Sequence, residues 1–169
     1  EGYVNGSREA FDKKKTLNNL NLLPAFNSVY SLSDKMNLRL AASRTVARPS
    51  FKEKSYASIY DPITKRTFVG NIDLDQTYIN NFDARYEWFI GPKELISVAG
   101  FYKQFDGHIE MVSFAVSPDE LKPRNSGNAE VMGAEFEIRK ALPGRDSSFI
   151  SNFFIGVNAT IVDSRVDLK

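Results

Sequence analysis

The side chains of this sequence that could do chemistry are one histidine and a few scattered acidic residues. His108 is the only histidine and the chain has no cysteine, so neither a thiolate ligand nor a second imidazole is available to a metal. Asp73 and Asp75 have the alternate spacing of calcium ligands, but the glycine and the closing glutamate of an EF-hand loop are missing. We therefore predict no metal site, and we assign His108 to a loop without a catalytic role.

Two carboxylates with the spacing of a general acid and base are Glu135 and Glu137. Their side chains lie two positions apart, and Arg139 follows at the same spacing. A basic residue beside two acidic ones is typical of an ion-paired or solvated wall, so we do not assign them to acid–base catalysis. The same interpretation applies to a second charged set: Asp83, Arg85 and Glu87.

Nucleophile and phosphate motifs are also missing from the sequence. Ser126-Gly127 and Gly6-Ser7 are not part of a nucleophile elbow, and no glycine-rich phosphate loop is present. We expect no enzyme activity, no catalytic residue and no cofactor, and the sequence names no substrate-binding residue.

The composition limits the function classes. The 169 residues suffice for one domain, and the 22 basic and 21 acidic residues give a net charge of +1, so no charge imbalance indicates a nucleic-acid partner. No apolar run approaches the ~20 residues of a transmembrane helix. Aromatic residues make up 12% of the chain, which favours strands. The mean hydropathy of −0.33 suits a soluble protein, but also a membrane barrel, because half of a barrel's positions face a polar interior.

The segment from Tyr78 to Phe105 organises the rest of the chain. Phe82, Ala84 and Tyr86 alternate with charged residues, which gives a strand with one apolar and one charged face. Tyr78 and Trp88 share the apolar face, roughly 33 Å apart along a strand. Tilted by about 45°, that span rises roughly 23 Å, close to the ~25 Å between the aromatic girdles of an outer-membrane barrel.

A turn at Gly91-Pro92-Lys93-Glu94 leads into the return strand. Ile96, Val98 and Tyr102 continue the apolar face, which places Phe101 on the polar face. The aromatic residues of the apolar face have two interpretations, a membrane girdle or a ligand-stacking platform, and we favour the girdle: Tyr30, Tyr86, Trp88 and Tyr102.

The remaining alternation predicts an all-β antiparallel meander of about six long strands. Their expected ranges are 22–32, 36–47, 77–90, 95–106, 129–141 and 149–162. Short turns (33–34, 91–94, 142–148) alternate with long external loops (48–75 and 107–127), as in an outer-membrane barrel. Residues 1–21, with lysines at 13–15, are expected to form a polar loop. Because a membrane barrel needs about eight strands, we interpret the chain as a sector of a larger barrel.

Several segments resemble the C-terminal part of the barrel of TonB-dependent outer-membrane receptors, particularly those of Bacteroidetes-like bacteria. The resemblance covers most of residues 20–165, and it depends on an ordered set of short motifs. These are LLPAFN (22–27), MNLR (36–39), SRTVARPSF (43–51), GNIDL (70–74), NFDARYEWF (81–89), FYK (101–103) and GAEFE (133–137).

The resemblance implies a 22-stranded transmembrane barrel with a plug domain, in the bacterial outer membrane, that takes up a siderophore, a glycan or a similar nutrient. Its implied partners are outer-membrane lipid, the plug of the same full-length chain, the TonB complex and a surface lipoprotein, with no nucleic acid. We expect this chain to be a fragment that contains neither the plug nor the segment that contacts TonB.

Two other function classes remain open at this point. A soluble β-sandwich or open-barrel binding module would bury the apolar face against a second sheet. A passive porin would share every strand feature. The barrel interpretation makes a specific prediction about facing, in which one set of residues contacts lipid: Phe82, Tyr86, Met132, Phe136, Val157 and Ile161. Asp83, Glu135 and Asn158 should face the interior.

Overall fold

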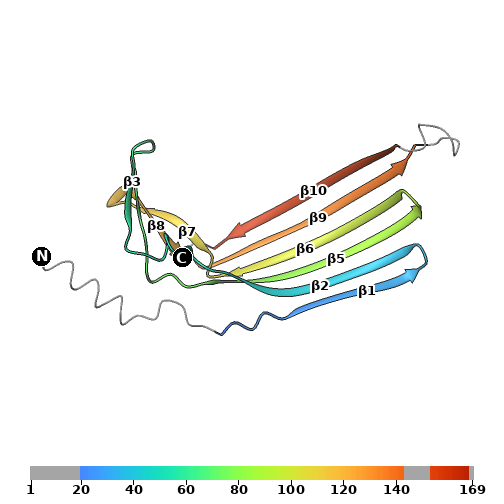
Figure 1. The fold of residues 1–169 in the computed structure, drawn as a ribbon, viewed down its shortest axis with the longest axis horizontal. Helices are drawn as coiled ribbons and strands as arrows, with labels where there is room; N and C mark the ends of the chain where they lie inside the picture. Colours follow the sequence, from blue (N-terminus) through green and yellow to red (C-terminus); the bar gives the residue numbers. More distant parts are fainter. Residues whose placement is uncertain (1–19, 143–152, 168–169) are drawn as a thin grey trace, which may run out of the picture.

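The computed structural model describes residues 20–142 and 153–167 of the chain. This part of the chain folds into ten β-strands and no helix, arranged in a large sheet and a small one (Figure 1). None of the described residues belongs to a helix that is long and apolar enough to cross a membrane. The all-β prediction is confirmed.

The large sheet contains the six predicted long strands in an antiparallel arrangement. Its spatial order is β1-β2-β5-β6-β9-β10, so each strand pairs with the next long strand along the chain. The bounds are β1 Ala25–Ser33, β2 Met36–Ala47, β5 Thr77–Gly91, β6 Glu94–Asp106, β9 Asn128–Ala141 and β10 Phe154–Val166. The short turns join these strands at one end of the sheet, and the long connections join them at the other (Figure 1).

Two of the predicted strand ranges need correction. The first strand begins at Ala25 and not at residue 22, because Pro24 has no N–H to give to the ladder, although its carbonyl accepts from the Arg44 N–H at 2.9 Å. The last strand runs to Val166 and not to residue 162, because its pairing with β9 continues as far as Val166 and Ala129. The charged residues near its end, which suggested a loop, are part of the ladder.

Some predictions lie outside the described residues. These are the lysine run at 13–15, the turn at 142–148 apart from residue 142, and the first residues of the range 149–162.

The two predicted long loops contain strands of their own, and these strands form the small sheet. The loop 48–75 contains β3 (Ser58–Asp61) and β4 (Arg66–Val69), and the loop 107–127 contains β7 (Ile109–Phe114) and β8 (Ser117–Asn125). The order is β3-β4-β8-β7, and the two hairpins meet where β4 and β8 pair in parallel. Each hairpin thus finds part of its pairing in the other loop, which a local sequence pattern does not reveal.

Few side chains are fully buried, and they lie where the two sheets meet. Leu74 is completely buried just before β5, and Pro123 of β8 is buried as well. The Lys54 ammonium bonds the Leu74 carbonyl. The large sheet itself leaves big apolar side chains exposed, among them Phe82 at 51% and Ile161 at 77%. Across the described part of the chain, therefore, the large sheet is a single layer with two accessible faces.

Candidate functional site

The register of the large sheet separates its side chains into an apolar and a polar face. Cross-strand partners align residues of the same kind, because the side-chain period of a strand is two. One row of the apolar face is Tyr30, Leu38, Tyr86, Val98, Phe136 and Ala159. The predicted lipid-facing set and the predicted interior set lie on opposite faces of this sheet.

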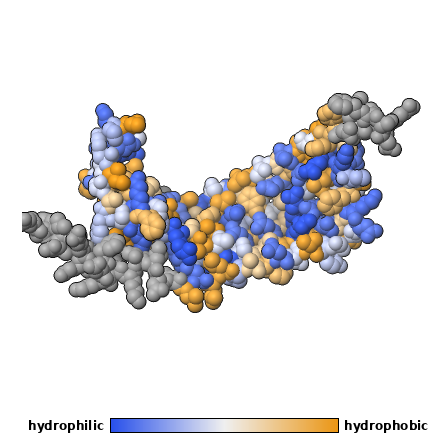
Figure 2. Space-filling model, in the orientation of Figure 1, coloured by the Kyte–Doolittle hydropathy of each residue, from blue (hydrophilic) through white to orange (hydrophobic). Residues whose placement is uncertain are grey.

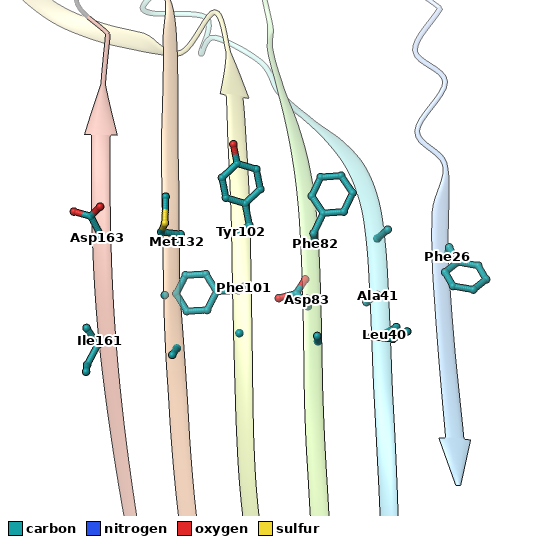
Figure 3. Close-up of a pocket in the computed structure, with 15 residues that line it drawn as sticks. Phe26, Leu40, Ala41, Phe82, Asp83, Phe101, Tyr102, Met132, Ile161 and Asp163 are labelled. Carbon is teal, nitrogen blue, oxygen red and sulfur yellow. The ribbon is translucent and has the colours of Figure 1, made fainter. Parts of the chain in front are cut away.

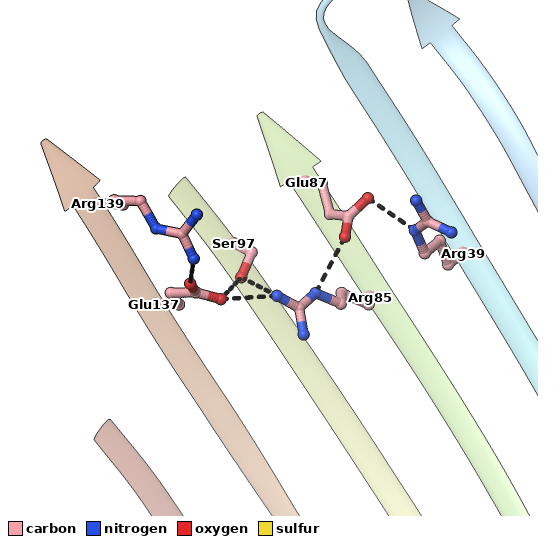
Figure 4. A network of polar contacts seen from close by, with 6 residues as sticks. All are labelled: Arg39, Arg85, Glu87, Ser97, Glu137 and Arg139. Carbon is pink, nitrogen blue, oxygen red and sulfur yellow. Dashed lines mark hydrogen bonds and ion pairs between the residues drawn. The ribbon is translucent and has the colours of Figure 1, made fainter. Parts of the chain in front are cut away.

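A chain of ion pairs crosses the polar face over four strands (Figure 4). Glu87 accepts a hydrogen bond from Arg39 at 2.7 Å and forms an ion pair with Arg85 at 3.3 Å. The guanidinium of Arg85 also reaches Glu137 at 2.7 Å, and Arg139 contacts the other oxygen of Glu137 at 3.0 Å. Acidic and basic groups therefore alternate across the strands, which is the ion-paired wall expected for these residues.

The register explains why this cluster forms. Glu87, Ser97 and Glu137 occupy one row of β5, β6 and β9, while Arg39 and Arg85 face each other in the adjacent row. Glu87 is only 8% exposed and Ser97 only 3%, because the long arginine side chains cover them. The Ser97 hydroxyl accepts from Arg85 at 3.0 Å, so this buried hydroxyl is satisfied. Figure 2 shows hydrophilic residues gathered towards the short-turn end of the sheet.

The polar-face position predicted for Phe101 is confirmed, and the structure explains it. Phe101 pairs across the strands with Gly133 of β9. Its ring occupies the space that a side chain at residue 133 would need: a methyl group added there would lie 2.5 Å from the Phe101 Cζ atom. The glycine thus makes room for the ring on an otherwise polar surface.

The four aromatic residues considered for a stacking platform do not come together. Tyr30 and Tyr86 lie in one row, Trp88 lies in the next row towards the short turns, and Tyr102 lies two rows away from Tyr86 in the other direction. The ring that stacks near Tyr102 is Phe82, at a centroid distance of 6.4 Å and an interplanar angle of 28°. This arrangement does not support the platform.

Polar residues form one complete row at the outer end of the apolar face. The row contains one residue from each of five strands: Arg44, Asn80, Gln104, Glu130 and Arg165. Asn80, which interrupts the apolar pattern of β5, thus belongs to this row and is not isolated. Above it, the Arg44 guanidinium lies over the Tyr78 ring at 4.4 Å.

His108 lies at the base of the β7–β8 hairpin. Its Nδ1 atom is 3.2 Å from the Gly127 carbonyl, and its Nε2 atom is 2.8 Å from the Glu110 carboxylate. The hydrogen bond from His108, and a further one from Ser126, hold the pKa of Glu110 below its ordinary value. Glu110 therefore joins the His108 and Ser126 side chains at the base of the hairpin.

Asp73 and Asp75, whose spacing resembles that of calcium ligands, donate backbone hydrogen bonds to two asparagine side chains, and only the bond from Asp75 joins the two long loops. The Asp73 N–H donates to the Asn71 side chain at 3.1 Å, and the Asp75 N–H donates to Asn125 at 2.9 Å. Within residues 20–142 and 153–167, no three His, Cys, Asp or Glu side chains are grouped so that they could hold a metal ion.

Asp61 shapes the tip of the small sheet. It accepts from the Thr64 hydroxyl at 2.8 Å and from the Ile63 N–H at 2.9 Å, and these bonds hold the pKa of the Asp61 carboxyl below its usual range. They fix the turn between β3 and β4, where Lys65 has a positive φ of 56°.

Sequence reasoning missed Asn125, which joins the two long loops. Its amide nitrogen donates to the Gly107 carbonyl at 2.7 Å and to the Asp75 carbonyl at 3.0 Å. The Thr77 hydroxyl reaches the same Gly107 carbonyl at 2.9 Å. An asparagine in a polar loop carries no signal of this role, because its partners are distant in sequence.

Solved structures similar to this chain include a siderophore receptor and a ferric enterobactin receptor. The siderophore receptor PirA from Pseudomonas aeruginosa aligns with a TM-score of 0.71 at 18% identity, over 88% of this chain and 29% of that chain. The ferric enterobactin receptor PfeA in complex with BCV-L6 aligns with a TM-score of 0.58 at 18% identity, over 75% of this chain and 20% of that chain. A PfeA mutant, R480A, from Pseudomonas aeruginosa in complex with enterobactin gives the same values. This chain thus spans less than a third of their length.

The sequence itself identifies the family. No curated protein matches the chain. A family model described as TonB dependent receptor-like, beta-barrel, matches residues 3–167, nearly the whole chain. Together with the six-stranded antiparallel sheet, this match shows that the chain belongs to the TonB-dependent receptor β-barrel family.

Proposed function

We propose that this chain forms one sector of the wall of a bacterial outer-membrane barrel that takes up a nutrient by TonB-coupled transport. The observation that carries the proposal is the division of the large sheet into an apolar and an ion-paired face, which is continuous across its strands. A sheet that faces lipid on one side and a polar interior on the other has this division.

The polar face would then line the interior and meet the plug domain of the full-length chain. Its row of ion pairs presents fixed charges of both signs, which suits contact with a folded polar partner. The small sheet of β3, β4, β7 and β8 would stand on the outer side of the membrane, where long loops of such barrels lie. A siderophore, a glycan or a similar nutrient is the substrate class we propose, with a surface lipoprotein as a further partner.

The facing can be tested with nitroxide spin labels in the intact barrel, reconstituted in lipid. Labels at Phe82, Tyr86, Met132, Phe136, Val157 and Ile161 should be relaxed strongly by lipid-soluble oxygen. Labels at Asp83, Glu135 and Asn158 should be relaxed by a water-soluble nickel complex instead. Reversed accessibilities would overturn the wall assignment.

Uptake itself separates the transporter from a passive porin. Cells that carry the full-length protein should lose uptake of its substrate when TonB is deleted or when the proton gradient across the inner membrane is collapsed. Uptake that continues unchanged in both conditions would favour the porin.

A further inference from the structure

The apolar face of the large sheet contains a groove, and its outline follows from the register. The row Leu40, Ala84, Gly100 and Ala134 has small side chains on β5, β6 and β9. The adjacent row towards the small sheet carries the bulky Phe82 and Tyr102 (Figure 3). Because the row of small side chains lies beside the row of bulky ones, a groove of about 880 Å³ with an almost wholly apolar lining is formed.

The groove continues into a second depression that ends at a basic side chain. The second depression has a volume of about 410 Å³, shares Phe26, Ala42 and Phe82 with the first, and is also lined by Arg44. Arg44 is exposed and lies over the Tyr78 ring. Among the described residues, its guanidinium has no acidic partner, so a positive charge is available at this end.

The other end of the groove carries no net charge. Asp163 of β10 lines it, but Arg165 neutralises this carboxylate at 3.1 Å. The second acidic residue of the lining, Asp83, belongs to the opposite, polar face of β5. The groove therefore has an apolar floor and one cationic end, which is the complement of a lipid with an acyl chain and an anionic phosphate. Its volume lies within the ~300–1,000 Å³ of ordinary small-molecule pockets.

We infer that this groove holds one acyl chain of an anionic, phosphate-bearing membrane lipid, whose phosphate bonds the Arg44 guanidinium. The inference rests on the proposed function, because it requires the apolar face to lie in the membrane. Beyond that function, it assigns one lipid to a defined place on the wall, where this lipid binds more tightly than the bulk lipids around the barrel.

Two substitutions test the two parts of the site. Arg44→Gln removes the cation and keeps the length of the side chain. Gly100→Leu fills the floor, and the strand has room for it: a Cβ atom at residue 100 would lie 3.9 Å from its nearest neighbour, the Gly133 carbonyl oxygen. The matched controls are Arg48→Gln, an exposed arginine just after β2 that lines neither depression, and Val98→Phe, which adds bulk to β6 one row away from the floor.

The experiment is native mass spectrometry of the intact barrel, released from nanodiscs made of equal amounts of phosphatidylglycerol and phosphatidylcholine. The wild type should retain phosphatidylglycerol in preference to phosphatidylcholine. Arg44→Gln should lower this preference about fivefold, the contribution of one basic side chain near an anionic headgroup. Gly100→Leu should abolish retention, and both controls should behave like the wild type.

Three results would overturn the inference. Retention by Gly100→Leu equal to that of the wild type would show that the floor holds nothing. An equal loss in Arg44→Gln and Arg48→Gln would show general charge attraction. A dimer of the barrel that is lost in both Gly100→Leu and Arg44→Gln would show that a second copy occupies the groove. Spin labels on the apolar face separate a failure of the lipid site from a failure of the wall assignment. Labels that show no contact with lipid would overturn both, whereas labels that do show it would overturn only the lipid site.

Discussion

At the scale of single residues, two glycines of the large sheet differ in what they make possible. Gly133 lies beneath the Phe101 ring and beside the Ile161 backbone, whereas a Cβ atom at Gly100 would make only an ordinary contact, at 3.9 Å from the Gly133 carbonyl oxygen. Both are strand glycines, and neither has the positive φ seen at Gly107 and Gly127. The difference between them is therefore one of space and not of backbone conformation.

Gly133→Ala should destabilise the barrel by about 1–3 kcal/mol, the usual cost of overpacking. The new methyl group would lie 2.5 Å from the Ile161 carbonyl oxygen, and a backbone atom in a paired strand cannot easily move away. Denaturant unfolding of the reconstituted barrel measures this loss. Gly100→Ala is the control and should cost nothing, because interior glycines weaken strands. Equal stability of the two variants would contradict this account.

The Glu110 carboxylate should make the base of the β7–β8 hairpin sensitive to acid. Because the hydrogen bonds from His108 and Ser126 lower the pKa of Glu110 in the folded state, its contribution is fully present above the ordinary carboxyl pKa. The contribution is lost as the pH falls through the lowered value. Hydrogen exchange of β7 and β8, corrected for intrinsic rates, should show protection declining below about pH 4.5.

Glu110→Gln is the matched variant for this prediction. It should have weaker protection at neutral pH and should lack the acid-dependent decline that belongs to this residue. A decline of the same size in the variant would assign the acid response to another group, such as Asp61.

At the scale of elements, the two long loops behave as one unit because their hairpins share a sheet. The parallel pairing of β4 with β8 is short, with Thr67 opposite Glu120 and Phe68 opposite Leu121. Side chains reinforce it: Asn71 donates to the Pro123 carbonyl at 3.0 Å, and Asn125 joins residues 75 and 107. We expect these loops to move as one unit.

Asn125→Ala tests this coupling. It removes three hydrogen bonds in a partly buried junction, and we expect local opening of the small sheet to become easier by about 1–3 kcal/mol. Hydrogen exchange should therefore become faster in both β4 and β8. Asp119→Ala, an exposed change on β8, should leave exchange unaltered. Faster exchange confined to β8 would show that the loops are independent.

The long strands could be predicted from the sequence because their information is local. Alternation in segments such as 81–88 fixes both the strand and its two faces, and the short turns fix which strands are neighbours. The pairing of the two loops was missed because β4 and β8 pair across more than 50 residues. The Arg85–Glu137 pair was missed for the same reason, since each charge alone indicates only a solvated face.

At the scale of the whole molecule, the large sheet is a single layer with two unpaired edges. Within the part of the chain that the structure describes, β1 pairs only with β2 and β10 only with β9. Unpaired edges and exposed apolar rows both promote association between chains. The 169-residue chain by itself is thus expected to depend on a detergent or on neighbouring strands.

Sedimentation of this chain with and without detergent micelles checks the expectation. It should form large aggregates in plain buffer and small, strand-rich particles in detergent. A monodisperse monomer without detergent would instead favour the soluble β-sandwich, in which a second sheet covers the apolar face.

The polar residues of the apolar face also mark where the apolar band of each strand ends. On β5 the outermost apolar residue below the polar row is Phe82, whereas on β10 Asp163 occupies that register position and the apolar residues begin one row lower, at Ile161. The border is level over β5, β6 and β9, at Phe82, Tyr102 and Met132, and it drops only at β10, by two residues or roughly 6.6 Å. If this border follows the water surface, water reaches one row deeper at β10 than over the other strands.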